Sequence, residues 1–416
     1  MIRLHVVALC LALASSAMAA DTTTNPMSGK SVAELGNVLN SNAPEMDRAN
    51  AALALAELVT PPKVEKRQKA PEWELKIPAS FIETCTIGLR DRSSAVRFYS
   101  GQALARAGAD ALPALIQAVQ SDNDDCKIAA IHAIGMMAKS MAGKKGSPEV
   151  ELTSVFGSTV PALRKALQDE NHIVREATCA TFSRLGTTGE PAIDELIALL
   201  DDGNFCVVNR AVHAVAAVDP AGVKSVPALV RALESKHDVR EFIVKELGDM
   251  GQAAKGAVPA LCRLVGEDKN SWHVALESTK ALLKIVTYEE KPQLDAMIPE
   301  RKQALRAIAQ AIAAQDATFL QARIRNTLFD HSGYCPIGGE IEPLMPWLET
   351  TLREWAKAEP GHYPPPVDKL CLLLAKIGRN YERDYVVSLA KELKSAKDTK
   401  EAYRNDFDPI LNLEDK

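Results

Sequence analysis

Aromatic side chains are scarce in this sequence: Phe, Trp and Tyr together make up 5% of its 416 residues. Surfaces that bind glycans or other cell-envelope polymers usually present aromatic platforms. The tryptophans Trp272, Trp347 and Trp355 are scattered along the chain. This scatter disfavours a polymer binder, which stays an alternative function.

No sign of charge dominates either. The chain carries 49 basic and 54 acidic residues, a formal net charge of −5. Proteins that bind nucleic acids or anionic membranes usually show a marked excess of Lys and Arg. We therefore expect no nucleic-acid partner.

Motifs of several enzyme classes are missing. The sequence has no P-loop, no G-x-G-x-x-G, no G-x-S-x-G and no H-E-x-x-H. It also lacks Cys-x-x-Cys, which argues against a redox pair, a zinc knuckle and attached haem. We therefore expect a protein without enzymatic activity, resident metal or cofactor.

The first residues are typical of a secretory signal peptide. Arg3 precedes a short apolar run, and Ala17-Met18-Ala19 supplies an A-x-A cleavage signal, so we expect residues 1–19 to be removed. No later stretch reaches the roughly 18 apolar residues of a membrane-spanning helix. The cleavage pattern is that of bacterial general secretion. We thus expect an exported protein, periplasmic or extracellular, with no membrane insertion after cleavage.

Cleavage would leave an odd number of cysteines, namely Cys85, Cys126, Cys179, Cys206, Cys262, Cys335 and Cys371. At least one thiol must then stay unpaired or pair with another chain, and the spacing does not give the connectivity. Cys179, Cys262 and Cys371 lie in segments whose pattern predicts helices, and we expect them to be small apolar core residues.

Apolar residues make up 47% of the chain, with many Ala and Leu, which favours a helical protein. One sequence pattern also recurs along the chain. Two of its copies are VPALRKALQDENHIVREATCATFSRLG (160–186) and VPALVRALESKHDVREFIVKELGDMG (226–251). The acidic residue that ends each first segment marks the period, at Asp91, Asp122, Asp169, Asp201, Glu234 and Glu267. The steps are 31, 47, 32, 33 and 33 residues, and an insertion at 141–157 accounts for the long one.

Each copy predicts a helical hairpin. Prolines such as Pro113, Pro161 and Pro227 open a first helix, where the missing N–H costs nothing. A polar turn leads to a second helix, and glycines such as Gly108 and Gly186 end it. A single hairpin cannot bury its apolar stripe, so the copies should stack around one continuous core.

The pattern P-A-L-x-x-A-L-x-D, then V-R-x-x-A, then L-G, resembles the HEAT repeat in its short bacterial form, also called the phycobilisome-lyase-type repeat. The match covers about half of the chain. The resemblance implies an all-α fold, an α-solenoid that is a right-handed superhelix of hairpins with helical caps. It also implies an interaction scaffold that binds over several repeats, since most members of the family are scaffolds and only a few are enzymes.

The expected organisation has four parts. Residues 1–19 form the signal peptide and 20–77 an N-terminal helical cap with a Pro-rich linker. Residues 78–287 hold about six HEAT-like repeats, with the insertion at 141–157. Residues 288–416 form a C-terminal helical region of degenerate repeats or a cap, ending in a charged, mobile tail from Asp398.

Cations recur at one position of the repeats. Each is expected to pair with the nearby turn acid, and the pairs to form a structural ladder between repeats, as the HEAT resemblance implies. The ladder residues are Asp91, Arg97, Asp169, Arg175, Glu234 and Arg240, with Lys127 close to the same position.

Histidines line the same turns, but His172, His237 and His273 are too far apart to share a metal and are expected to be exposed. His132 and His213 fall inside second helices, where we expect them to be packed or paired. No His-Glu dipeptide occurs, so the ligand pattern of metal-dependent hydroxylases built on this repeat is missing.

The insertion at 141–157 is the candidate partner-binding site. Insertions in repeat arrays often lie on the binding face. This one offers Lys144 and Lys145, followed by Val155 and Phe156, which we expect to be exposed.

The segment with Asp330, His331, Tyr334 and Cys335 is the alternative, an enzyme or lyase-like site with a Cys–His nucleophile. No family motif matches there, and a structural loop, with Cys335 bonded to Cys371, is favoured. The sequence thus predicts a non-catalytic protein-interaction scaffold of the bacterial cell envelope, with an unidentified protein partner.

Overall fold

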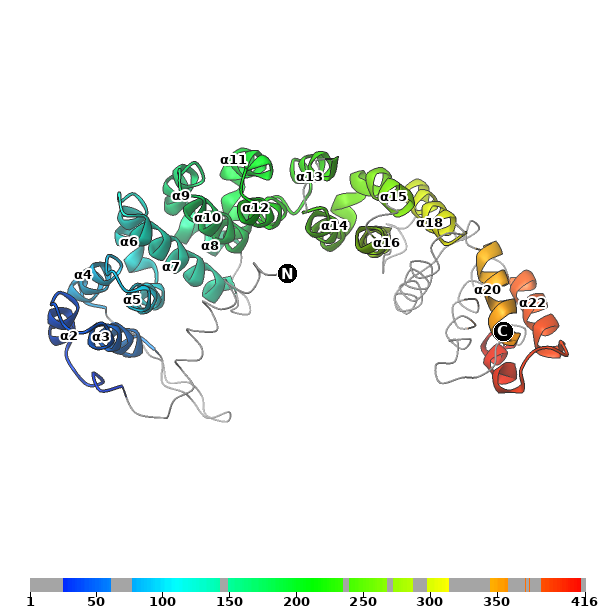
Figure 1. Ribbon diagram of the computed structural model, residues 1–416, viewed down its shortest axis with the longest axis horizontal. Coiled ribbons are helices and arrows are strands. Elements are labelled where there is room, and N and C mark those ends of the chain that lie inside the picture. Colours follow the sequence, from blue (N-terminus) through cyan, green and yellow to red (C-terminus); the bar gives the residue numbers. More distant parts are fainter. Residues whose placement is uncertain are drawn as a thin grey trace. The chain divides into compact units, whose positions relative to one another are not determined.

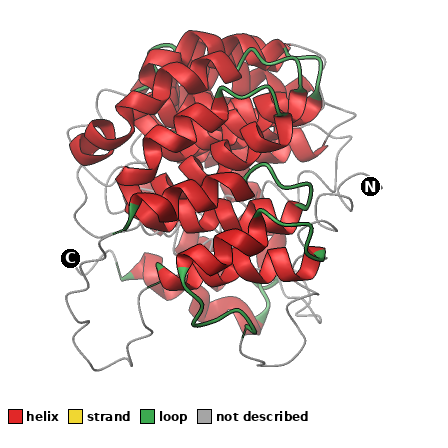
Figure 2. Ribbon diagram, turned by 90° about the vertical axis from the view of Figure 1, so that its left-hand side faces the viewer, coloured by secondary structure: helices red, strands yellow, loops and turns green. Residues whose placement is uncertain are grey.

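A computed structural model describes residues 25–60, 77–142, 149–234, 239–267, 272–286, 298–313, 345–357, 371, 374 and 383–412. Within these ranges every regular element is helical, and there is no strand (Figure 2). The chain forms two compact units, Met1–Asp219 and Pro220–Lys416. The predicted signal peptide and the segment from Asp330 to Cys335 lie outside the described residues.

The first unit is a stack of helical hairpins. Its hairpins are α2–α3 (Val32–Leu39, Glu45–Leu58), α4–α5 (Ala79–Gly88, Ser94–Ala107), α6–α7 (Leu112–Val119, Asp124–Ala142), α9–α10 (Val160–Ala166, His172–Leu185) and α11–α12 (Ile193–Ala198, Phe205–Val218). One further helix, α8 (Glu149–Phe156), lies between the third and fourth hairpins. Short 3₁₀ turns join hairpins at Gly108–Ala111, Gly157–Thr159 and Gly186–Ala192.

The helices of this unit form two layers, with the first helices outside and the second helices inside the curve of the stack (Figure 1). Second helices contact one another more extensively than first helices do. Small buried residues such as Ala52, Gly101 and Ala133 let their backbones approach closely. Closer packing of one layer than of the other produces the curvature.

The expected start and stop signals are confirmed. Pro113 and Pro161 stand in the first turns of α6 and α9. Gly108 and Gly186 follow α5 and α10 with φ of 78° and 57°. Only glycine adopts such angles without steric cost, so it ends these helices cleanly.

The N-terminal segment that was expected to be a cap contains a hairpin of the same kind. Helix α3 packs along α5, and α2 packs on α4, as in the later hairpins. Ser31 and Glu34 form a reciprocal capping box at the start of α2. The stack therefore begins at Val32, before the repeats that the sequence pattern identified.

The second unit contains the hairpins α13–α14 (Ser225–Glu234, Arg240–Asp249) and α15–α16 (Val258–Glu267, Trp272–Val286). A 3₁₀ segment, Gly251–Ala257, joins the two, and α18 (Ile298–Ala313) packs on α15 and α16. Further helices are α20 (Met345–Lys357), α22 (Arg383–Ser395) and α23 (Asp408–Leu411). The side chains of Trp272, Trp347 and Trp355 lie outside the described part.

The prediction of a mobile tail from Asp398 is wrong. A 3₁₀ helix, Glu401–Phe407, and α23 fold back on α22. Tyr403, Phe407 and Ile410 are buried, because their spacing puts them on one helical face despite the surrounding charges. Arg404 also donates to the main-chain carbonyl of Lys394.

The buried thiols follow the prediction in part. Cys179 and Cys371 are buried, but Cys262 is only half-buried and Cys206 is exposed. No disulfide links Cys85, Cys126, Cys179, Cys206 and Cys262 to one another. Cys335 lies outside the described residues, so its pairing with Cys371 stays a prediction.

Candidate interaction surface

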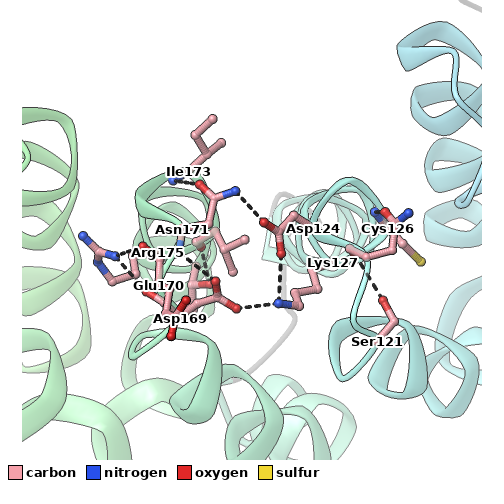
Figure 3. Close-up of polar contacts among 12 residues, drawn as sticks. Ser121, Asp124, Cys126, Lys127, Asp169, Glu170, Asn171, Ile173 and Arg175 are labelled. Atoms are coloured by element: carbon pink, nitrogen blue, oxygen red, sulfur yellow. Dashed lines mark hydrogen bonds and ion pairs between the residues drawn. The ribbon is translucent and has the colours of Figure 1, made fainter.

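The second helices are held in register by polar contacts at their N-terminal ends. In one such contact, Lys127 of α7 bonds to the carboxylate of Asp169 in the next hairpin, with an Nζ–Oδ2 distance of 2.7 Å (Figure 3). Beside it, the Nδ2 of Asn171 donates to Asp124 Oδ2 at 2.8 Å (Figure 3). Asn171 also caps α10 by accepting from the N–H of Ile173. Each rung thus joins two neighbouring hairpins twice.

The same rung occurs between the first two hairpins. Arg48 of α3 donates to both carboxylate oxygens of Asp91, at 2.7 and 3.1 Å. Ser93 donates to Glu45 Oε1 at 2.6 Å, so it takes the place that Asn171 holds in the later rung. The ladder therefore exists, and it begins one hairpin earlier than the sequence analysis placed it.

The expected pairing within the ladder is wrong in register. Arg97 and Arg175 contact their own turn acids only at the main chain, through the carbonyls of Asp91 and Asp169. The Arg175 guanidinium instead bonds to the carboxylate of Asp202, at 2.8 and 3.1 Å. The turn carboxylates Asp169 and Asp202 therefore pair with the cation of the preceding hairpin and not with that of their own hairpin. In the stack, the cation of one hairpin lies next to the turn acid of the following hairpin.

The remaining predicted members depart from the ladder. Arg97 reaches Asp125, at 3.2 Å, because Ser121 occupies the place of the turn acid in that hairpin. In the second unit, Arg240 donates to the main-chain carbonyl of Leu233, and Glu234 lies 3.5 Å from Arg263. Arg240 and Glu234 are thus not paired with each other.

These contacts shift the acidity of the groups that form them. Burial alone would raise the pKa of Asp91 and Asp202, but hydrogen bonds from Arg48 and Arg175 and from main-chain N–H groups hold both pKa values below the usual range. The bond to Asp169 raises the pKa of Lys127. The ladder is therefore ionised at neutral pH.

Beyond the ladder, the inner face of the second helices is open to solvent. Phe98 on α5 and Ile173 on α10 are 54% and 46% exposed, although both are large apolar residues. His132 on α7, Arg184 on α10 and Arg210 on α12 are also exposed. We call the exposed side chains of α5, α7, α10 and α12 the inner surface.

Three basic side chains of the inner surface affect one another. Desolvation lowers the pKa of Arg184, and repulsion from Arg210 lowers it further. Desolvation by the surrounding helices also lowers the pKa of His132, with Arg184 and Arg210 adding to the effect. His132 was expected to be packed or paired; its side chain reaches solvent, while the surrounding helices desolvate it in part. The sequence gives no sign of this group, since the three residues come from three different repeats.

The insertion is built differently from the prediction. Lys144 and Lys145 lie outside the described residues. Helix α8 places Phe156 in the core, fully buried, and leaves Val155 half-buried. The expected exposure of Phe156 is wrong, because α8 folds back and packs against α7 and the turn at Gly186–Ala192. Thr153 and Thr188 hydroxyls lie 3.2 Å apart across that contact.

The other histidines differ in their exposure. His172 and His273 are exposed as predicted, His213 is half-buried, and His237 is outside the described residues. In the described ranges, no three His, Cys, Asp or Glu side chains gather closely enough to hold a metal ion. No described helix combines the length and apolar character needed to cross a bilayer.

Comparison with solved structures identifies the fold. The chain is similar to Kap95p in a complex with RanGDP, with a TM-score of 0.54 and 12% sequence identity over 92% of this chain and 52% of the other. It is also similar to importin beta, with a TM-score of 0.50 and 12% identity over 92% of this chain and 57% of that one. A mutant of Kap121p is similar with a TM-score of 0.50 and 14% sequence identity, over 92% of this chain and 44% of that one.

The fold is a HEAT-like repeat solenoid. At these identities the likeness concerns the fold alone, and the chain spans about half the length of the structures that it matches. No protein-family model matches the sequence, and no curated protein matches it.

Proposed function

We propose that this protein is a non-catalytic scaffold that binds another protein through the inner surface of its first unit. The observation that carries the proposal is the composition of that surface, where Phe98 and Ile173 are exposed and the same layer of helices also carries exposed basic side chains. The concave surfaces of repeat solenoids are the extended binding surfaces that these proteins use. The likeness to Kap95p, seen in complex with RanGDP, supports a protein ligand.

We further propose that the scaffold acts outside the cytoplasm, in the bacterial cell envelope. The support is the sequence of residues 1–19, with its basic start, apolar run and A-x-A signal. N-terminal sequencing of the protein purified from the producing cells tests this. A start at Ala20 supports export, and an intact Met1 in a cytosolic fraction contradicts it.

Site-specific photo-crosslinking tests the scaffold. A photoreactive amino acid replaces Gln102, which is half-buried on the inner surface, or Gln117, which is exposed on the outer helix α6. In envelope extract we expect a discrete cross-linked protein from position 102 and none from position 117. Equal labelling at both positions, or none at either, contradicts the proposed surface.

The insertion is tested separately by replacing Lys144 and Lys145 with Gln. This double variant leaves the buried Phe156 in place, so it does not disturb the core as a deletion of 141–157 would. We expect cross-linking from position 102 to persist in it. Loss of the cross-link would place the contact at the insertion instead.

A further inference from the structure

The C-terminal parts of α5, α7, α10 and α12 carry only one sign of charge, whereas that of the first such helix, α3, contains Glu57. The segments 102–107, 132–142, 180–185 and 210–218 contain no Asp or Glu. They do contain basic side chains, namely Arg106, His132, Lys139, Arg184, Arg210 and His213. Because these segments belong to adjacent helices of one layer, the inner surface bears a basic band in a chain whose net charge is −5.

Within this band, Arg184 of α10 lies close against α7. A Cβ at Gly135 of α7 would stand 2.8 Å from Arg184 Nη1 and 3.5 Å from its Cδ, so the absence of a side chain there makes room for the guanidinium. Thr181, one turn earlier in α10, donates to the main-chain carbonyl of Ile131 and fixes the two helices together. Among the described residues, no carboxylate pairs with Arg184, although its side chain is exposed.

Arg210 and His132 stand on α12 and α7, the two helices that pack against α10. The side chain of Arg210 is 47% exposed, and its Nε lies 3.5 Å from Oε1 of Glu176. His132 is exposed on the next helix. Of the three side chains Arg184, Arg210 and His132, only Arg210 thus contacts a carboxylate among the described residues.

A structural role at the helix ends accounts for only part of this. Cations in the last turn interact favourably with the helix macrodipole, which amounts to roughly half a charge. That explains the placement of Arg106, Lys139 and Arg184. It does not explain His132 and Arg210, which lie away from their helix ends, nor does it neutralise the repulsion between Arg184 and Arg210.

We infer that the basic band binds an acidic segment of the protein partner, whose Asp or Glu carboxylates bond to Arg184 and Arg210. A planar guanidinium offers two parallel N–H donors to a carboxylate, which gives both strength and orientation. A peptide carboxylate would also relieve the repulsion that the two arginines now impose on each other. This inference rests on the proposed function, because it names the chemistry of the partner of that same surface.

Fluorescence anisotropy with a labelled oligo-glutamate peptide tests the band directly. The mature chain should bind this probe and not an oligo-lysine peptide, and added salt should weaken the binding. Arg184→Gln should weaken it about tenfold, as expected for a lost charge-assisted hydrogen bond. Arg184→Lys, which keeps the charge, should lose less. Absence of binding by the wild-type chain overturns the inference.

Arg90→Gln is the matched control, since Arg90 is exposed on the turn after α4 and loses the same charge. Its affinity should stay within about twofold of wild type, because a surface charge remote from the site changes binding little. If Arg90→Gln and Arg184→Gln weaken binding equally, the peptide senses only overall charge and the inference fails. Circular dichroism of each variant shows that its helices are intact.

The photo-crosslinking experiment separates the two proposals. Mass spectrometry locates the partner segment that is attached to position 102. An acidic segment supports both proposals. A discrete partner attached through a basic or apolar segment leaves the scaffold standing and overturns the acidic ligand. With no partner at position 102 the scaffold fails, even if oligo-glutamate binds.

Discussion

Arg48 and Asp91 form a buried ion pair between two successive hairpins, and their side chains are only 4% and 9% exposed. The guanidinium donates to both carboxylate oxygens and also to the main-chain carbonyl of Ala43. Desolvated charges of this kind depend on each other, since either one alone would remain uncompensated in the interior. This relationship makes the first hairpin part of the array.

Removing the cation of this pair should therefore be costly. Arg48→Gln should lower the free energy of unfolding of the first unit by about 3 kcal/mol, because Asp91 then stays buried without its counter-ion. Urea unfolding followed by circular dichroism measures the change. Arg164→Gln breaks the more exposed pair with Glu195 in the same unit and should cost less than about 1 kcal/mol. Equal losses of unfolding free energy in the two variants would show that the buried ion pair contributes no more to stability than the exposed one.

The ladder also predicts a pH dependence of stability. The pKa of Asp202 is lowered in the folded protein, so its ionised form contributes stability above the unfolded pKa of about 3.8. That contribution is lost as pH falls through the folded pKa. Asp202→Asn should therefore lower Tm at pH 6 and flatten the decline of Tm below about pH 4. Parallel Tm curves for variant and wild type would contradict this role.

A close approach of α4 and α5 can be tested by exchange of small residues. A Cβ at Gly88 would stand 2.0 Å from Ser100 Oγ and 2.9 Å from Ser100 Cβ. Gly88→Ala should destabilise the first unit by about 1–3 kcal/mol through overpacking. Adding Ser100→Gly should recover part of that loss in thermal unfolding. Gly157→Ala is the control, since no atom lies within 4 Å of the added carbon.

Within the insertion, substitution of Phe156 should lower stability, whereas substitution of Lys144 and Lys145 should not. Phe156→Ala should cost about 3 kcal/mol, because the side chain is fully buried. Lys144→Gln with Lys145→Gln should leave Tm within about one degree of wild type, as for typical surface substitutions. Differential scanning calorimetry of both variants decides the point. An unchanged Tm for Phe156→Ala would return that residue to the candidate binding site.

Thiol labelling should distinguish the cysteines by their burial. Burial raises the pKa of Cys85 and Cys179 strongly, and that of Cys262 to about 11, so at neutral pH these thiols should react slowly or not at all. Cys206 is exposed and should react in the fast phase. Cys206→Ser should remove one equivalent from that phase. A fast phase of unchanged size would contradict the placement of Cys206.

The fold could be predicted from the sequence because its signals are local. Pro161 and Gly186 set helix ends through their own backbone chemistry, and the spacing of Leu163, Ala166 and Leu167 marks a buried face. Recurrence of these signals at a fixed period is enough to indicate stacked hairpins and hence a HEAT-like solenoid.

The partners of individual side chains could not be predicted. Whether Arg175 meets Asp169 or Asp202 depends on how far one hairpin is offset against the next, which the period alone does not give. The grouping of His132, Arg184 and Arg210 also needs this offset. Phe156 was misjudged because the apolar residues of a short inserted helix do not reveal which neighbouring surface that helix covers.

The direction of the ladder has a consequence for how the chain acquires its structure. The carboxylates of Asp91, Asp169 and Asp202 each receive their cation from the hairpin that precedes them in sequence. A chain that emerges N-terminus first, from a ribosome or a translocation pore, therefore presents every new acidic turn to a counter-ion that is already in place. When the chain grows in that direction, each of these carboxylates is synthesised after the cation that pairs with it.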